Sequence, residues 1–245
     1  METVGIILTY KHASFLEETY RRIPGGILDK IIVVDDSSDD GTKDLARKLS
    51  LPFYSTPKNL GYGGNIEYAL TIAAKLGAKY MVEIHGDGQY DPKYIPKALH
   101  KIKRKGCDFL LGSRFKSLTQ PLKDHMPLSR YLANIGLNLI ARLVLQIPLT
   151  EFHSGFRIYT RRLIETIGFE GTSNTNIYSF ENIAQAAYHK LSICEIAIRC
   201  DYAKEHTSLS LKRSIVYSFQ MLWVLVLYLL AKFGLKSRLF APGLK

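Results

Sequence analysis

Two adjacent carboxylates stand at the end of an apolar segment early in the chain. This segment, Lys30–Asp36, reads KIIVVDD and is followed by turn-forming residues and a helical pattern. Carboxylates at such a point can accept hydrogen bonds from a ribose or from the N–H of a nucleobase. A helix N-cap would also use an acid here, and Asp39 or Asp40 supplies it. Because a cap needs only one carboxylate, Asp35 and Asp36 are left for a ligand.

A glycine-rich segment, Asn59–Asn65, reads NLGYGGN and precedes another helical pattern. Glycines such as Gly63 at this point let backbone N–H groups approach a phosphate. The segment does not match G-x-G-x-x-G, because Ile66 occupies the third glycine position, and it follows the wrong strand for a dinucleotide fold. It therefore predicts a phosphate-binding loop and disfavours a Rossmann dehydrogenase.

A third polar segment, Glu83–Pro92, reads EIHGDGQYDP. His85 and Asp87 are two residues apart, so they point the same way from an extended chain. Such a pair can hold a divalent cation against a diphosphate, with Asp as the hard oxygen ligand and His as a second ligand. The alternative is a capped turn that begins the next helix. That alternative accounts for Asp91 and leaves Asp87 unexplained.

These polar segments lie between short apolar segments that alternate with helix-length ones. The predicted strands are residues 4–8, 30–36, 79–85 and 107–113, and the predicted helices are residues 13–22, 42–49, 64–76 and 92–104. This alternation is typical of βαβ units in a mostly parallel sheet. Ligands bind at the carboxyl ends of such strands, so we expect the polar residues there to meet at one edge.

The pattern changes after residue 120. It predicts a long apolar helix over residues 128–145, a strand over 155–160, a helix near 180–189 and a strand over 191–198. Residues 214–231 are 18 residues without a charge, the lower limit for a transmembrane helix. Its Ser, Tyr and Gln residues favour docking on a membrane surface over spanning it. A core helix or a dimer face is the alternative.

Composition and charge narrow the class of protein. The chain has 245 residues, 47% of them hydrophobic, which excludes a disordered chain and a polytopic membrane protein. The net charge is +11, and the excess comes from residues 101–130, with 8 basic and 2 acidic side chains, and residues 201–245, with 7 and 2. Each segment lies beside an apolar helix, which favours an anionic membrane surface, and no nucleic-acid recognition signature accompanies them.

Cysteine usage indicates a reducing compartment. The chain has three cysteines, Cys107, Cys194 and Cys200, with no C-x-x-C pair. They predict neither a disulfide framework nor a zinc cage.

Together the motifs resemble those of the family 2 glycosyltransferases, which have the GT-A fold, in the branch of the dolichol-phosphate mannosyltransferases and other polyprenyl-phosphate sugar synthases. The resemblance runs from about residue 3 to about residue 210 and rests on five segments in order: Asp35–Thr42, Asn59–Gly63, Gly86–Gln89, Gly112–Phe115 and Ser154–Arg157. It implies an α/β fold with a mostly parallel central sheet flanked by helices. We expect a GT-A domain over residues 1–210 and a membrane-associating, basic-flanked apolar or amphipathic helix over residues 211–245.

The resemblance also implies roles for individual residues. Thr9 and Tyr10 would contact the nucleotide base, Asp35 and Asp36 the base and ribose, and Gln89 the donor sugar. Asp87 matches the second acid of the D-x-D metal motif, while His85 replaces the first acid. Lys11 stands where many relatives have other residues, which leaves base specificity open.

Other residues would neutralise phosphate charge or act as the base. Arg114 and Arg157 would neutralise phosphates of the donor or acceptor, with structural ion pairing as the alternative for Arg114. Glu151 occupies the position of the base, where the family usually has Asp, and His153 is its local rival. Glu151 alternatively serves only as a cap or loop residue, or orients the acceptor phosphate.

The activity that the resemblance implies is inverting transfer of a sugar from a UDP- or GDP-sugar to a polyprenyl phosphate, with Mg²⁺ or Mn²⁺. The enzyme would work at the cytoplasmic face of the membrane, as a peripheral protein or with a single C-terminal anchor, and homo-oligomerisation stays open. The alternatives are a family 2 transferase with a soluble or glycan acceptor and a nucleotide-binding module without turnover. A lipid phosphate is already ionised near neutral pH, whereas a sugar hydroxyl acceptor needs a general base.

Overall fold

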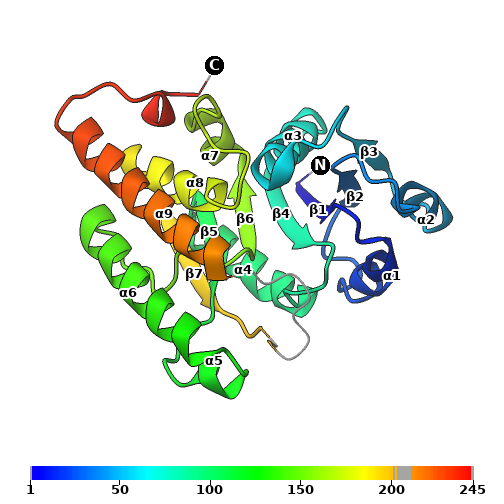
Figure 1. The fold of residues 1–245 in the computed structure, drawn as a ribbon. Coiled ribbons are helices and arrows are strands. Elements are labelled where there is room, and N and C mark those ends of the chain that lie inside the picture. Colours follow the sequence, from blue (N-terminus) through cyan, green and yellow to red (C-terminus); the bar gives the residue numbers. More distant parts are fainter. Residues whose placement is uncertain (1, 201, 203–210, 244–245) are drawn as a thin grey trace.

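A seven-stranded sheet forms the centre of the protein in a computed structural model, which describes residues 2–200, 202 and 211–243. Its order is β3-β2-β1-β4-β6-β5-β7 (Figure 1). The strands are β1 (Thr3–Thr9), β2 (Lys30–Asp35), β3 (Phe53–Ser55), β4 (Tyr80–His85), β5 (Phe109–Ser113), β6 (Arg157–Thr160) and β7 (Ile193–Ala197). Only β6 runs antiparallel to its neighbours within these described strands, so the predicted mostly parallel sheet is confirmed.

The strand register brings the polar strand ends together, as the sequence predicts. Thr9 at the end of β1 pairs with Asp35 at the end of β2, and Leu8 pairs with His85 at the end of β4. Parallel strands place their carboxyl ends at the same edge of a sheet. Residues from three separate segments of the chain therefore meet there.

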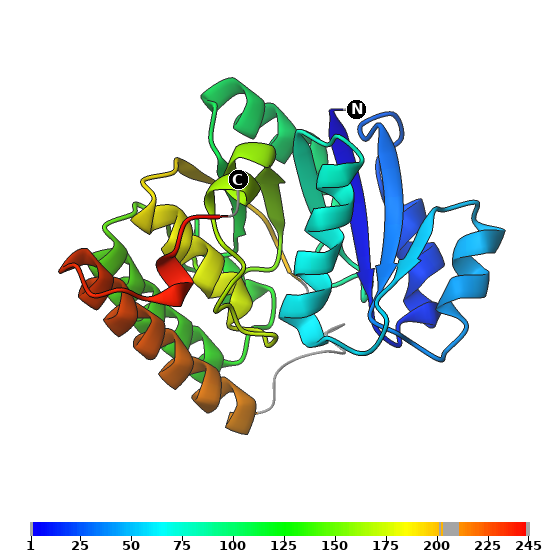
Figure 2. The ribbon, with the colours of Figure 1, turned by 90° about the horizontal axis from the view of Figure 1, so that it is seen from above.

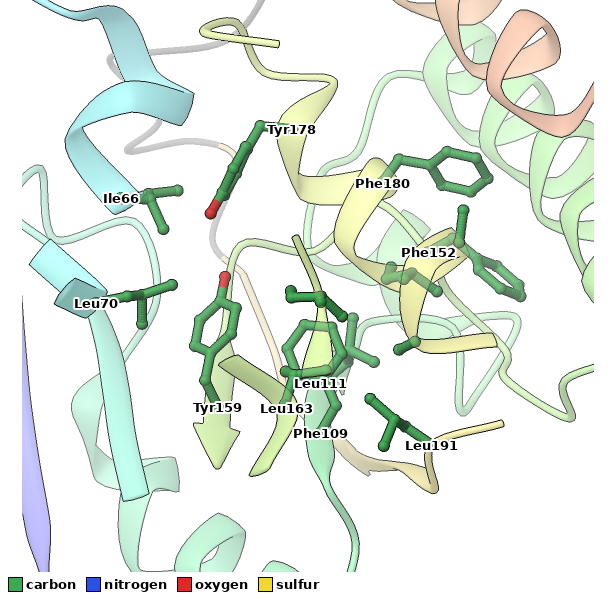
Figure 3. Packing of buried hydrophobic residues seen from close by; sticks show 14 of the residues in the cluster. Ile66, Leu70, Phe109, Leu111, Phe152, Tyr159, Leu163, Tyr178, Phe180 and Leu191 are labelled. Carbon is green, nitrogen blue, oxygen red and sulfur yellow. The ribbon is translucent and has the colours of Figure 1, made fainter. Parts of the chain in front are cut away.

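Helices cover both faces of the sheet. One face packs on α1 (Ala13–Arg21), α2 (Thr42–Lys48) and α4 (Ile95–Lys105), which η1 (Pro92–Tyr94) precedes. The other packs on α3 (Gly61–Lys75) and α8 (Tyr178–Tyr188), with α6 (Leu128–Leu145) and α9 (Leu211–Lys232) outside them. Figure 3 shows part of this second core, where Phe109 and Tyr159 pack at a ring-centroid distance of 4.9 Å. The short helices α5 (Gln120–Lys123), α7 (Arg161–Thr166) and η3 (Arg238–Phe240) complete the described elements.

Two features of the sequence interpretation need correction. Strand β3 and helices α5 and α7 were not predicted, because three to six residues are too few to show a hydrophobic period. Cys107 and Cys194 form a disulfide between the start of β5 and β7, although no C-x-x-C spacing announces it. The parallel pairing of β5 with β7 brings together two cysteines that lie 87 residues apart in the chain.

Helix α9 is part of the main domain. Its Met221, Val224, Leu225, Tyr228 and Ala231 are buried in the same cluster as the sheet and α8. Figures 1 and 2 show α9 lying alongside α6. The predicted boundary at 210/211 thus separates segments that share one core, and residues 203–210 lie outside the described part.

The length and composition of α9 also fit a membrane span. Among the described residues one helix, Lys212–Lys232, is long and apolar enough to cross a membrane, with a mean hydropathy of 1.9 and 28% of its most apolar window buried in the protein. Because a whole stripe of the helix is in the core, spanning would require α9 to leave that core. The packing favours an α9 that stays on the domain.

Helix α9 has a buried side and an exposed side, and comparing substitutions on the two sides tests this packing. We expect Met221→Ala to lower the free energy of unfolding by about 2–5 kcal/mol, the usual loss for a fully buried large side chain. Phe219→Ala on the exposed stripe is the matched control and should change it by less than about 0.5 kcal/mol. Denaturant titration of both variants makes the comparison. Equal effects would contradict the docking of α9 on the domain.

Candidate active site

A cavity of about 920 Å³ opens at the carboxyl edge of β1, β2 and β4. Of the predicted site residues, those that line it are Thr9, Tyr10, Asp36, His85, Asp87, Gln89 and Arg114. Asp35, Gly63, Glu151 and Arg157 are not among its lining residues. The structure therefore brings most of the predicted set into one cavity and places four residues in the surrounding shell.

Asp35 organises the loop that follows β2. Its carboxylate accepts hydrogen bonds from the Thr9 hydroxyl at 2.8 Å, from the Ser38 amide at 2.7 Å and from the Ser38 hydroxyl at 2.7 Å. Ser38 in turn accepts a hydrogen bond from the amide of Lys11, at 2.8 Å. These bonds join the loops after β1 and β2, so Asp35 shapes the cavity from behind Thr9.

Asp36 joins β2 to the N-terminus of α3. Its carboxylate accepts hydrogen bonds from the amides of Leu60 and Gly61, both at 2.8 Å, and from the Thr56 hydroxyl at 2.9 Å. The first amides of a helix have no partner inside the helix and favour a negative charge. This anchor explains why α3 begins at Gly61, earlier than the predicted residue 64.

Gly63 serves close packing. Its amide donates to the Asn174 carbonyl at 3.0 Å, so it is not available to a phosphate. A Cβ at this position would lie 2.2 Å from the Ser173 carbonyl oxygen and 2.8 Å from Cβ of Tyr178. The glycine is needed because α3 touches the segment before α8.

His85 and Asp87 face the cavity from the end of β4. His85 Nε2 lies 3.0 Å from a carboxylate oxygen of Glu83, and Asp87 accepts a hydrogen bond from the Gln89 amide at 3.0 Å. Burial lowers the pKa of His85, but the hydrogen bond and charge of Glu83, together with the charge of Asp87, raise it above the usual value. Glu83 is a buried acid beside the site that the sequence interpretation missed. Its period-2 spacing from His85 on one strand face was the available signal.

The donor atoms of this site suit a hard divalent cation that shares its ligands with a substrate. Within the described residues, no group of three His, Cys, Asp or Glu side chains could hold a metal alone. Mg²⁺ is commonly bound through one or two carboxylates, with phosphates and water completing its shell. Asp87, with His85 beside it on the cavity wall, fits that kind of site.

Arg114 and Glu151 form a buried ion pair at the end of β5. Glu151 is fully buried, and its two oxygens accept from the Arg114 amide at 2.6 Å, from Nε at 2.7 Å and from Nη2. Burial lowers the pKa of Arg114, but the charge of Glu151 raises it well above its usual value. The structure agrees with the ion-pair alternative for Arg114, and it leaves Glu151 no oxygen directed at the cavity for a role as base.

His153 is equally unsuited to act as a base. It lines the cavity, and its Nδ1 lies 3.0 Å from the Tyr217 hydroxyl of α9. Burial, together with the charges of Arg114 and Arg157, lowers the pKa of His153 to about 3. The imidazole is therefore neutral near pH 7 and binds a proton only weakly.

Arg157 lies beneath the cavity floor. It is fully buried, and its guanidinium donates to the carbonyls of Ser154, at 3.0 Å, and Ser179. It stands directly opposite Glu83 in the β4–β6 pairing. Direct contact of Arg157 with a phosphate would need a rearrangement, because its side chain is fully buried and does not line the cavity.

The far wall of the cavity comes from α6 and α9. Its residues include Arg130, Ala133 and Leu137 of α6, and Arg213, Tyr217 and Ser218 of α9. The sequence interpretation treated Arg130 and Arg213 only as flanking charge. Each stands near the start of an apolar helix, and that shared position was the signal for a common site.

The outer surfaces of α6 and α9 are apolar. We call them the apolar face, made of exposed Leu128, Leu132, Leu139, Ile140 and Leu143 of α6, and Ile215, Val216, Phe219, Trp223, Val226, Leu229 and Leu230 of α9. The helices lie side by side in both ribbon views (Figures 1 and 2). Exposed apolar side chains gathered on two neighbouring helices are typical of a protein–protein or membrane contact. The same two helices thus line the cavity inside and present apolar side chains outside.

Comparison with known sequences identifies relatives along nearly the whole chain. The family model described as glycosyl transferase family 2 matches residues 6–168. A UDP-N-acetylglucosamine–dolichyl-phosphate N-acetylglucosaminyltransferase of Methanococcus voltae is 24% identical over 244 residues, covering 93% of this chain and 96% of its own. An undecaprenyl-phosphate mannosyltransferase of Micrococcus luteus is 27% identical over 188 residues, covering 74% and 75%. An uncharacterized protein of Methanocaldococcus jannaschii is 27% identical over 226 residues, covering 92% and 91%.

Solved structures show the same fold. Glucosyl-3-phosphoglycerate synthase from Mycobacterium tuberculosis, in complex with Mn²⁺, UDP and glucosyl-3-phosphoglycerate, superposes with a TM-score of 0.69. The match covers 96% of this chain and 81% of that chain at 16% identity. At this identity the likeness establishes the GT-A fold, as the sequence motifs predict.

The Arg114–Glu151 pair yields a test of its role. We expect Glu151→Gln to lower the free energy of unfolding by about 3–5 kcal/mol, because it leaves the Arg114 charge buried without its partner. Glu165→Gln, at an exposed pair with Arg161, is the matched control and should have little effect. Chemical denaturation measures both. A Glu151→Gln protein of normal stability that loses only turnover would instead assign Glu151 to catalysis.

Proposed function

Because the chain belongs to glycosyl transferase family 2, we propose that it transfers a sugar, with inversion, from a nucleotide-sugar donor to a polyprenyl phosphate. One observation carries the proposal. A single cavity is lined on one side by the strand-end residues Thr9, Asp36 and Asp87, and on the other by two helices whose outer surfaces are apolar. The relatives named for dolichyl-phosphate and undecaprenyl-phosphate transfer support the choice of acceptor.

The donor would bind at the strand-end side. Tyr10, 43% exposed at the cavity, offers a ring to the base, and Thr9 and Asp36 border the same region. Gln89 would border the sugar. The donor nucleotide is UDP or GDP; the UDP-N-acetylglucosamine of the Methanococcus voltae relative favours UDP.

A divalent cation, Mg²⁺ or Mn²⁺, would be held by Asp87 with His85 beside it, and when bound it supplies positive charge to the leaving diphosphate. Arg114 lines the same cavity and is held in place by its ion pair with Glu151, so its guanidinium would meet the diphosphate without moving. The buried charge of Arg157 would add to this attraction without touching the phosphates. These residues orient the diphosphate and favour its departure.

The state of the two candidate bases favours a phosphate acceptor. Glu151 has both oxygens occupied by Arg114, and burial with the charges of Arg114 and Arg157 lowers the pKa of His153 to about 3. A sugar hydroxyl acceptor needs a base to take its proton, whereas an ionised phosphate oxygen attacks without losing one. Arg130 and Arg213 line the α6–α9 side, where they would meet the acceptor phosphate. A soluble or glycan acceptor is the second candidate, and it requires a base that neither residue supplies.

The apolar face would rest on the cytoplasmic leaflet of the membrane. Its aliphatic and aromatic side chains can enter the boundary between head groups and acyl chains. Arg142 in the last turn of α6, Lys232 in the last turn of α9 and Lys236 beyond it suit an anionic surface. Docking in this way keeps the buried stripe of α9 in the domain and brings the cavity to the lipid, so a peripheral attachment is proposed over a C-terminal anchor.

The proposed transfer is tested with labelled donors. The protein is incubated with UDP- and GDP-sugars, Mg²⁺ or Mn²⁺ and a polyprenyl phosphate, and label should move to the organic phase. Asp87→Asn should reduce this transfer at least about 100-fold, since the cation contributes several kcal/mol. Asp91→Asn is the matched control, because Asp91 caps η1 in the same loop without lining the cavity.

Other outcomes of this assay would contradict the proposal. Donor binding without any transfer would indicate a nucleotide-binding module. Label appearing on a soluble glycan would indicate the second candidate. Full activity of Asp87→Asn would show that the cation site is misassigned.

Membrane docking is tested with vesicles containing phosphatidylglycerol. We expect Phe219→Ser combined with Trp223→Ser to weaken vesicle binding at least about tenfold, because each large side chain contributes about 1.5–3 kcal/mol when buried. Leu118→Ser is the matched control, an equally exposed apolar residue outside the apolar face. Unchanged vesicle binding together with loss of a dimer in size-exclusion chromatography would assign the face to a second copy of the chain.

A further inference from the structure

Glu83 is a buried acid with no part in the transfer described above. It lies on β4, with 4% of its surface exposed, next to the cavity but not among its lining residues. Three groups surround its carboxylate. One oxygen lies 3.0 Å from His85 Nε2 and 3.1 Å from the Tyr62 hydroxyl, and the other accepts from the Tyr159 hydroxyl at 2.7 Å. These hydrogen bonds fix the positions of the His85, Tyr62 and Tyr159 side chains around the carboxylate.

The hydrogen bonds define which nitrogen of His85 faces Glu83. A carboxylate only accepts hydrogen bonds, so His85 Nε2 must carry the proton in this contact. The other ring nitrogen, Nδ1, is then the one left for a ligand. His85 and Asp87 both line the cavity, where a cation and a diphosphate would bind.

The surroundings of His85 hold its ring in one orientation. The Tyr90 ring packs edge-on at a centroid distance of 5.2 Å, and the Tyr62 ring lies at 6.0 Å on a tilt. A Cβ on Gly155 would lie 2.6 Å from His85 Nε2, so only glycine leaves room for the ring in this place. Gly155, in the Ser154–Arg157 motif, therefore leaves the room that the His85 ring needs. The packing of Tyr62 and Tyr90 and the contact with Glu83 together hold the His85 ring in this orientation.

We propose that Glu83 is a positioning residue that binds the Nε2–H of His85 and so presents Nδ1 as a cation ligand beside Asp87. A carboxylate that accepts from one nitrogen of a ligating histidine fixes its tautomer and increases its basicity. This inference rests on the proposed function, because it assumes that a divalent cation binds with the donor diphosphate. In this chain, His85 held by Glu83 would take the place of the first acid of the family's D-x-D motif.

The test measures Mn²⁺ binding directly. The full-length protein is titrated with Mn²⁺ in the presence of UDP or GDP, and free Mn²⁺ is read by electron paramagnetic resonance. Glu83→Gln keeps the shape of the side chain and should weaken Mn²⁺ binding about 10- to 100-fold. Tyr159→Phe removes a partner from the other carboxylate oxygen and should leave Mn²⁺ affinity unchanged.

A double mutant separates positioning from general stability. If Glu83 acts through His85, Glu83→Gln should cause no further loss of Mn²⁺ affinity in a His85→Ala background. Additive losses, or a folded Glu83→Gln protein with unchanged Mn²⁺ affinity, would overturn the inference. Should Glu83→Gln fail to fold, electron spin-echo modulation of the wild-type Mn²⁺ complex decides. It should show a bonded histidine nitrogen that His85→Ala removes, and absence of that signal overturns the proposal.

The two proposals fail in different ways. Transfer to lipid by a wild-type protein whose Mn²⁺ affinity does not depend on Glu83 would remove only the role of Glu83. Glu83-dependent Mn²⁺ binding in a protein that transfers no sugar to any polyprenyl phosphate would remove only the proposed acceptor.

Discussion

The hydrogen bonds from the α3 N-terminus to Asp36 are the constraint on which the site depends. This carboxylate joins the end of β2 to the amides of Leu60 and Gly61, which a helix leaves without internal partners. Asp35 accepts hydrogen bonds from Thr9 at the end of β1 and from Ser38 in the loop after β2. These hydrogen bonds hold the ends of β1 and β2 and the start of α3 in place at the edge of the cavity.

A layer of buried charges lies beneath and beside this cavity. Glu151 holds Arg114, and Glu83 holds His85 opposite Arg157. Such groups are costly to bury, and each acid is compensated by several hydrogen bonds. The layer fixes the orientation of cationic and cation-binding side chains, which suits a reaction in which negative charge develops on a diphosphate.

Helix α9 contributes both to the cavity and to the apolar face. One stripe packs in the core, another belongs to the apolar face, and its first turns line the cavity beside His153. A contact between the apolar face and a membrane would therefore place lipid next to the reacting groups. The arginines of α6 and α9 at the cavity and the apolar face of the same two helices therefore lie close together.

The sequence alone determined the α/β fold, the mostly parallel sheet, the bounds of α6 and the residues at the strand ends, because these follow from local periodicity and from the geometry of parallel strands. It could not determine how charges pair across the fold. Glu151 and Arg114 are 37 residues apart, and Arg157 faces Glu83 only through the antiparallel strand β6. Whether an acid contacts a ligand or a buried arginine depends on which side chains meet in space, so only the tertiary structure made Glu151 a partner of Arg114 and Glu83 a partner of His85.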